Sequence, residues 1–324
     1  MLFLAGDIGG TKTHLILFQP GSKVPKRLRE KTFPSQNYPS LDKILTEFLQ
    51  GANADIETAC FGVAGPVEGE KCRTTNLPWV VDARRLKEKM AIKKVIIIND
   101  LEANAYGVQV LPQDQFFLLN PGALKQGNCA LISAGTGLGE AGFYFDGKVS
   151  HPFACEGGHC DFAPTTSLEI DLFSYLKQQF DHVSYERILS GPGLYNIYRF
   201  LIDTNRVTEA LPALRDIDPK SAPKVISEKG LSGESPACAE SLKIFASIYG
   251  AEAGNLALKL LALGGVYVGG GIAPKLLPII KQGHFFSAFK SKGRFHTLLE
   301  TIPIRIVLNE ETALLGAMSC ALKK

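Results

Sequence analysis

The sequence predicts an α/β protein built from two similar halves, and three observations support this fold class. Short runs of β-branched and aromatic residues alternate with helical patterns, as in a sheet covered by helices. Two glycine-rich loops, at residues 9–10 and 135–139, each follow a predicted strand. The length of 324 residues is sufficient for two domains of ordinary size. We therefore expect two α/β domains with a ligand between them.

Composition and charge exclude several classes of protein. A net charge of +3 is too small to indicate nucleic-acid binding, and the basic cluster at residues 23–31 has the alternation of an exposed strand face. The longest uncharged run, residues 260–274, is too short to cross a bilayer, and we expect no secretory leader. The seven cysteines are odd in number and favour a reducing cytoplasm over a disulfide framework.

The N-terminal residues predict a β-hairpin. Residues 2–8 and 13–18 have strand patterns, and Gly9-Gly10 between them permits the positive φ values of a tight turn. The two strands should therefore pair antiparallel. Backbone N–H groups of such a loop can wrap a phosphate, and Asp7 beside it could hold a hydrated metal ion.

Further elements complete a first α/β unit. Residues 26–33 predict a third strand, and apolar residues at helical spacing predict a helix over 41–49. A strand over 58–63 and a short charged helix over 82–90 follow. Pro78, in the segment before Trp79, indicates a loop or an edge position.

The centre of the sequence combines a buried strand with two polar residues. Four β-branched residues, 95–98, predict the strand, and a helix is predicted over 101–110. Asn99 and Asp100 therefore lie at the carboxyl end of the strand, the edge where open α/β sheets bind ligands. Two interpretations remain open here: Asp100 takes part in chemistry, or it caps the helix.

The second half begins with strands predicted at 115–119 and 130–134. The glycine loop after them is not a dinucleotide fingerprint, because Glu140 stands where the last glycine is required. Residues 142–148 imitate a P-loop but continue with Val149, and Asp146-Gly147 is more typical of a hairpin turn.

The remaining elements are mainly helices. Helices are predicted over 167–180 and 192–202, and residues 203–235 form a polar excursion. The pattern over 237–263 predicts a long helix with a break near Gly250 and Gly254. A strand over 266–268, a glycine loop, a strand over 302–307 and a helix over 311–322 end the chain.

The motifs in this order resemble those of the bacterial ATP-dependent glucokinases, members of the actin-like ATPase superfamily of sugar kinases. The resemblance covers nearly the whole chain and rests on Gly6-Asp7-Ile8-Gly9-Gly10-Thr11, Asn76-Leu-Pro-Trp79, Ile98-Asn99-Asp100, Gly135-Thr136-Gly137-Leu138-Gly139, Glu156-Gly-Gly-His159-Cys-Asp161, Glu186-Arg-Ile-Leu-Ser-Gly-Pro-Gly193 and Gly269-Gly-Gly-Ile272.

The resemblance implies a fold and an activity. The fold is a two-domain actin-like ATPase (ribonuclease H-like) fold with a cleft between a small and a large α/β domain. The small domain spans residues 1–108 and is completed by about 301–324, and the large domain spans 109–300. The activity is phosphorylation of the glucose 6-hydroxyl by ATP with Mg²⁺, which gives glucose 6-phosphate and ADP at the start of glycolysis. The expected partner is a small sugar; a homodimer is left open.

The resemblance also assigns residues to roles. Asp100 is the expected base that accepts the proton of the 6-hydroxyl, a step that needs mainly positioning and modest proton acceptance. The expected sugar ligands, whose side chains can pair with hydroxyls, are Asn99, Asp100, Glu156, His159 and Glu186. The expected nucleotide-binding residues are Asp7 (also the Mg²⁺ ligand), Gly9, Gly10, Thr11, Thr136, Gly137, Gly270 and Gly271. Trp79 is expected near the mouth of the cleft, with a packed core position as the alternative.

Several alternatives accompany these assignments. Cys155, His159 and Cys160 form a partial zinc pattern, but no second pair at ligand spacing completes it. Glu186 and His182 are four residues apart, and a surface helix pair is the alternative to a site role. Lys12 receives no role. Other functions that we weigh are a kinase for mannose or glucosamine, a non-catalytic sugar-sensing regulator, and an actin-like or chaperone-like ATPase.

Overall fold

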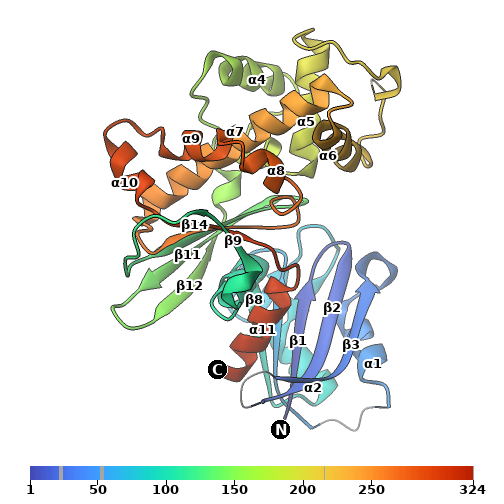
Figure 1. Ribbon diagram of the computed structural model, residues 1–324. Coiled ribbons are helices and arrows are strands. Elements are labelled where there is room, and N and C mark those ends of the chain that lie inside the picture. The colour runs from blue at the N-terminus through green and yellow to red at the C-terminus, as the bar shows by residue number, and fades with distance from the viewer. Residues whose placement is uncertain (22–24, 52–54, 215, 324) are drawn as a thin grey trace. The chain divides into compact units, whose positions relative to one another are not determined.

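The structure, a computed structural model, describes residues 1–21, 25–51, 55–214 and 216–323, so Lys23 of the basic cluster lies outside the described residues. The chain divides into two compact units (Figure 1). A small unit comprises Met1–Gln113 and Asn309–Lys324, and a large unit comprises Asp114–Leu308. These junctions lie later than the expected ones at 108 and 301. The reason is that β9 (Phe116–Asn120) and β14 (Ile304–Val307) pair antiparallel inside the large unit.

The small unit is built on a five-stranded sheet. Its strands are β1 (Leu2–Ile8), β2 (Lys12–Gln19), β3 (Lys26–Pro34), β4 (Ile56–Val63) and β8 (Lys94–Asn99), in the order β3-β2-β1-β4-β8. The predicted glycine hairpin is confirmed, because β1 and β2 pair antiparallel from Ile8↔Thr13 onward. Since β1, β4 and β8 are parallel, their carboxyl ends share one edge of the sheet.

Helices cover both faces of this sheet (Figure 1). On one face α1 (Leu41–Leu49) and α2 (Ala83–Met90) enclose an apolar core, and α1 has the predicted bounds. On the other face α3 (Asp100–Val108) lies against α11 (Thr312–Lys323). The helices touch at glycine: a Cβ on Gly316 would lie 1.7 Å from the Ala103 carbonyl oxygen. The small strands β5 (Val67–Glu68), β6 (Lys71–Arg73) and β7 (Val80–Asp82) form a separate sheet.

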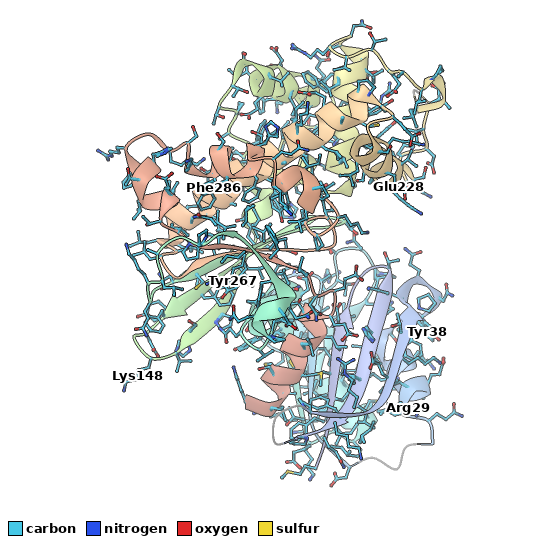
Figure 2. All side chains as sticks on the ribbon, in the orientation of Figure 1. Arg29, Tyr38, Lys148, Glu228, Tyr267 and Phe286 are labelled. Carbon is cyan, nitrogen blue, oxygen red and sulfur yellow. The ribbon has the colours of Figure 1, made fainter. Side chains whose placement is uncertain are left out.

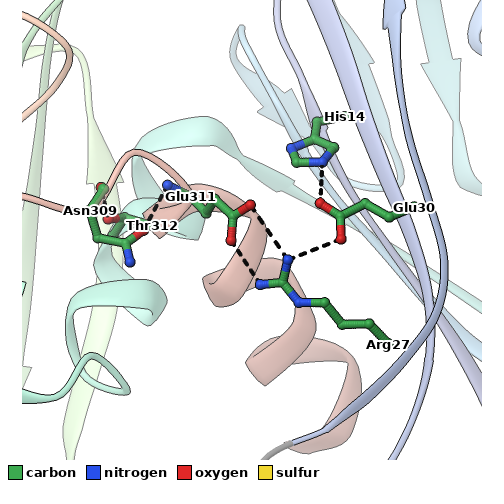
Figure 3. A network of polar contacts seen from close by, with 6 residues as sticks. All are labelled: His14, Arg27, Glu30, Asn309, Glu311 and Thr312. Atoms are coloured by element: carbon green, nitrogen blue, oxygen red, sulfur yellow. Dashed lines mark hydrogen bonds and ion pairs between the residues drawn. The ribbon is translucent and has the colours of Figure 1, made fainter.

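An ion-pair network ties the C-terminal segment to the N-terminal sheet (Figure 3). Arg27 on β3 donates to both Glu30 and Glu311, at 3.0 and 2.7 Å, and Glu30 accepts from His14 on β2. The Arg27 guanidinium lowers the pKa of Glu311. Because Glu311 directly precedes α11, the network fixes the start of the last helix on the small unit.

Trp79 is a core residue rather than an exposed loop residue. Its side chain is only 2% exposed and packs in the cluster beneath α1 and α2. The indole N–H donates to the carbonyl oxygen of Tyr38, at 3.1 Å; Figure 2 labels Tyr38 and, on β3, Arg29 in the small unit. The alternative interpretation of Trp79 is therefore the one that the structure supports.

The large unit contains a six-stranded sheet. Its strands are β9, β10 (Cys129–Ala134), β11 (Leu138–Phe145), β12 (Ser150–Cys155), β13 (Gly265–Gly269) and β14, in the order β12-β11-β10-β13-β14-β9. The predicted Asp146-Gly147 hairpin is confirmed. Asp146 Oδ1 accepts from the N–H groups of Lys148 and Val149, and Gly147 has a φ of +95°.

Helices form the other layer of the large unit. They are α4 (Ser167–Lys177), α5 (Gly191–Asp203), α6 (Ala222–Ser232), α7 (Pro236–Leu260), α8 (Leu277–Ile280), α9 (His284–Lys290) and α10 (His296–Glu300). The predicted break in α7 is wrong, because the helix is continuous. Its glycines permit close contact with α9: a Cβ on Gly250 would lie 2.0 Å from the Phe285 carbonyl oxygen. None of the helices in the described ranges is both long and apolar enough to cross a membrane.

Candidate functional site

Asn99 and Asp100 lie where β8 passes into α3, as the sequence predicts. The helix cap is Asn99, because its Oδ1 accepts from the N–H groups of Leu101 and Glu102, at 2.8 and 3.4 Å. Asp100 is the first helical residue, and its Oδ1 accepts from the Leu101 N–H at 2.9 Å. The carboxylate is half-buried at the N-terminus of the helix.

Both the oxygen and the nitrogen of the Asn99 side-chain amide have structural roles. Besides the cap, its Nδ2 donates to the Gly65 carbonyl oxygen at 3.1 Å, and the side chain is 7% exposed. These bonds connect the ends of β8 and β4. A sugar that binds Asn99 would therefore meet an amide whose orientation is already fixed.

Asp7 lies on β1, beside the same edge. It pairs in register with Gly62 of β4, and a Cβ on Gly62 would lie 3.8 Å from the Asp100 Cα. Burial raises the pKa of Asp7, and the charges of Lys12 and His14 partly offset this shift. Lys12, which received no role from the sequence, thus acts electrostatically on a predicted site residue.

The first glycine loop is held by Ser35, which the sequence reasoning missed. Ser35 Oγ donates to the Gly9 carbonyl oxygen at 2.8 Å, and its N–H donates to the Thr11 carbonyl oxygen at 3.0 Å. Gly10 lies against Asn76, since a Cβ there would be 2.6 Å from the Asn76 Cβ. Two motifs of the sequence, residues 6–11 and 76–79, therefore meet in the small unit.

The second glycine loop follows β10 in the large unit and contacts Glu186. The Gly135 N–H donates to the Gly137 carbonyl oxygen at 2.8 Å, and Thr136 at the tip is exposed. Glu186 Oε2 accepts from the Leu138 N–H at 3.0 Å. A Cβ on Gly137 would lie 2.4 Å from that oxygen, so the glycine makes room for the carboxylate.

Glu186 does not form a surface helix pair with His182. It lies in a short 3₁₀ helix, Tyr185–Arg187, whereas His182 contacts Asp161 at 2.7 Å. The segment that carries Glu156 and His159 runs beside this helix: Asp161 bridges to Ser184, and the Phe162 N–H donates to the Val183 carbonyl oxygen at 2.9 Å. The large unit thus gathers three predicted sugar ligands on two adjacent segments.

Gly270 and Gly271 follow β13, the parallel neighbour of β10. A Cβ on Gly270, whose φ is +80°, would lie 2.2 Å from the Ala134 carbonyl oxygen, whereas Gly271 faces open space. The Ile272 N–H donates to the same Ala134 oxygen at 3.2 Å. The predicted nucleotide loops at 135–137 and 270–271 are therefore adjacent in the large unit.

Among the described residues, the potential metal ligands whose ligand atoms lie within 4.8 Å of one another are His14, Glu30 and Glu311. Cys155, His159 and Cys160 do not form such a group. Arg27 already pairs with both of its carboxylates (Figure 3), so this group is an ion-pair network.

Glu140, which served in the sequence only to reject a dinucleotide motif, is a buried carboxyl group. It is 1% exposed on β11, and burial together with the nearby charge of Glu252 raises its pKa. No local sequence pattern indicated this pair, because Glu252 is on α7.

Comparison with known proteins extends these observations. A model of the glucokinase family matches residues 4–324. A glucokinase of Trichormus variabilis is 40% identical, and the match covers 99% of this chain and 98% of the relative. A glucokinase structure from an Antarctic psychrotroph has a TM-score of 0.83 at 29% identity, covering 100% of this chain and 99% of that one.

A further structure, a glucokinase from Balamuthia mandrillaris in complex with glucose, has a TM-score of 0.85 at 21% identity and covers 99% of this chain and 93% of that chain. At this identity the likeness concerns the fold alone. The predicted fold class, that of the actin-like ATPase sugar kinases, is confirmed.

Proposed function

Because the chain belongs to the glucokinase family, we infer that it is an enzyme that phosphorylates glucose. The phosphoryl donor is ATP, and the products are glucose 6-phosphate and ADP, the first step of glycolysis. The observation that carries this conclusion is the family match over nearly the whole chain. The residue roles that follow are our proposal, supported by the local geometry of each unit.

We assign the catalytic base to Asp100. As the sugar 6-hydroxyl attacks the γ-phosphorus of ATP, its O–H bond breaks and the proton passes to the Asp100 carboxylate. The bond between γ-phosphorus and the bridging oxygen breaks, and ADP leaves. The support is the position of Asp100 at the N-terminus of α3, where Asn99 rather than Asp100 provides the main cap.

Glu156, His159 and Glu186 are the proposed sugar ligands of the large unit, and Asn99 is that of the small unit. Carboxylates accept hydrogen bonds from sugar hydroxyls, and an imidazole can donate or accept. Glu186 also binds the Leu138 N–H, which follows the proposed phosphate loop. A displaced Glu186 should therefore disturb both substrates.

Two sets of residues are proposed to bind the nucleotide. The backbone of Gly9, Gly10 and Thr11 and that of Thr136 and Gly137 would bind phosphates, and Gly270 and Gly271 would approach the adenosine. Asp7 fits Mg²⁺: this ion takes one or two protein carboxylates together with phosphate and water oxygens, and a cation would offset the cost of burying the charge. When bound, Mg²⁺ supplies charge neutralisation to the phosphates.

The base assignment is tested by Asp100→Asn. We expect kcat to fall by roughly 10²- to 10⁴-fold, the usual contribution of a general base, while calorimetry shows glucose affinity largely kept. Glu102→Gln makes the same change two residues further along α3 and should keep wild-type turnover. An Asp100→Asn enzyme that turns over at the wild-type rate would remove Asp100 from catalysis.

The sugar ligands are tested by comparing Glu156→Ala with Glu186→Ala. Both should raise KM for glucose by roughly tenfold or more, because hydroxyl partners in a polar site are lost. Only Glu186→Ala should also raise KM for ATP, since it releases the Leu138 N–H. Unchanged glucose KM values in both variants would show that the sugar binds elsewhere.

A coupled ADP-release assay over glucose, mannose and glucosamine tests the preferred hexose. We also propose that the enzyme works in the cytoplasm, a reducing compartment that fits the odd number of seven cysteines. The homodimer remains a hypothesis. Light scattering tests it directly, because it measures the molar mass of the protein in solution.

A further inference from the structure

The segment that carries Glu156 and His159 rests on a buried carboxyl group. Glu140 lies on β11, paired in register with Cys155 of β12. A Cβ on Gly157 would lie 1.9 Å from Glu140 Oε2, so the carboxyl group fills the space directly against the backbone of Gly157. Gly157 begins the 3₁₀ turn Gly157–His159, immediately after Glu156. The Glu140 carboxyl group is therefore in direct contact with this turn.

Glu140 faces a second buried carboxyl group, Glu252 of α7, which is 0% exposed. The donors are distributed unequally between the two. Asn255 Nδ2 donates to Glu252 Oε2 at 2.8 Å, and Lys259 lies 3.5 Å from Glu252 Oε1. Tyr185 also hydrogen-bonds to Glu252. By contrast, no donor among the described residues reaches Glu140 Oε1.

This unequal distribution of hydrogen-bond donors indicates that the two carboxyl groups together hold one proton and one negative charge. Two ionised carboxylates are both acceptors and cannot hydrogen-bond to each other, whereas a protonated carboxyl group can donate to an ionised one. Glu252 has the donors that stabilise an anion, so Glu140 holds the proton. The single negative charge that remains is matched by Lys259.

Other titratable groups surround the pair. Those that act on Glu140 besides Glu252 and Lys259 are Cys155 of β12 and Tyr249 of α7. Those that act on Glu252 include Tyr185 and Lys292, and Cys160 acts on Lys259. Burial raises the pKa values of Cys155, Tyr185 and Tyr249, which favours the neutral form of each of these groups.

We propose that Glu140 and Glu252 share one proton and act as positioning residues that hold the Glu156–His159 segment in the conformation that binds the sugar. Loss of the shared proton places two negative charges beneath this segment, next to the carboxylate of Glu156. The turn then shifts, and glucose binds more weakly. This inference rests on the proposed function, because it assumes that Glu156 and His159 bind the sugar.

The test measures KM for glucose and for ATP, and the calorimetric Kd for glucose, from pH 7 to 9.5. In the wild type, KM and Kd for glucose should rise by roughly tenfold, as expected if the sugar complex holds the proton about one pKa unit more tightly. KM for ATP should change by less than about twofold, because the contacts of the pair described above are with Gly157, Asn255 and Lys259, outside residues 135–137 and 270–271.

Two single variants sharpen the test. Glu140→Gln and Glu252→Gln each limit the pair to at most one negative charge at any pH, so both should keep the wild-type glucose KM at pH 7 and lose the alkaline rise. The second variant decides the question if the first does not fold. Glu209→Gln is the matched control: Glu209 is also buried in the large unit but is bound by Tyr198 and Ser235, and its variant should keep the alkaline rise.

A wild type without an alkaline rise, a rise that persists in both variants, or its loss in Glu209→Gln would each overturn the proposal. These outcomes differ from failure of the proposed function, in which the wild type would not phosphorylate glucose at any pH.

Discussion

The two units contain sheets with the same order of strand directions but different chemistry at matching positions. In the small unit the order β3-β2-β1-β4-β8 has two antiparallel pairs followed by two parallel pairs, and β12-β11-β10-β13-β14 in the large unit has the same pattern. Each places a glycine loop between the first parallel strand and its antiparallel neighbour. The shared frame positions the two loops that we propose to bind phosphate, and the residues at matching positions differ between the units.

The clearest difference is at the third residue pair from each glycine loop. In the small unit this pair is Gly6↔Leu15, and in the large unit it is Ile132↔Glu140. Both Leu15 and Glu140 are almost fully buried. Leu15 packs in an apolar cluster, whereas Glu140 has Glu252 and its donors nearby. A buried carboxyl group is therefore tolerated where a neighbouring helix supplies polar partners. The shared strand order alone does not supply such partners.

The largest effect is expected when Leu15 of the small unit is replaced by glutamate, the residue type at the matching position of the large unit. Leu15→Glu should lower the free energy of unfolding by about 4 kcal/mol or more, because an apolar contact is lost and a carboxyl group is buried in a cluster of apolar side chains. Urea denaturation measures the loss. Leu15→Met, which nearly conserves volume, should cost less than about 1.5 kcal/mol. Equal losses in the two variants would contradict the argument.

A smaller effect is expected when the carboxyl group is removed from the large unit. The pKa of Glu140 is raised from an ordinary 4.5 to about 8. Between these values the folded protein keeps a proton that the unfolded chain has released, so this group makes stability fall as pH rises. Glu140→Gln removes the effect, and its stability relative to wild type should increase across this window, by up to about 1.4 kcal/mol per pH unit.

Thermal melting of Glu140→Gln and wild type at pH 5, 6.5 and 8 checks this prediction. The difference in Tm should grow with pH. A Tm difference that is the same at all three pH values would mean that Glu140 is ionised in the folded protein. Glu140 would then not be the neutral buried counterpart of Leu15.

Local patterns predicted the parts of the fold that depend on neighbouring residues. The Gly9-Gly10 hairpin, the Asp146-Gly147 turn and the bounds of α1 follow from turn chemistry and periodicity, and all are present. Asp100 was predicted at the end of its strand, but the choice between Asn99 and Asp100 as the cap needed side-chain geometry.

Features that depend on distant contacts were not predictable. Gly250 was expected to break α7, yet its missing side chain instead allows α9 to approach. Trp79 was placed near a cleft because of its motif, but it fills the core beside Tyr38. The contact of Glu186 with Leu138 and that of Glu140 with Glu252 join segments far apart in the sequence, and no periodicity encodes them.

The division of the chain has a consequence for the order of synthesis. The small unit is interrupted by the whole of the large unit, and α11 supplies much of the apolar face that covers β1 and β4. A ribosome therefore releases all the strands of the small unit long before the helix that completes it. The large unit, which is continuous, can fold while this face is still uncovered. Until α11 emerges, the nascent small unit exposes an apolar surface, and it is the half of the protein that most needs protection by chaperones.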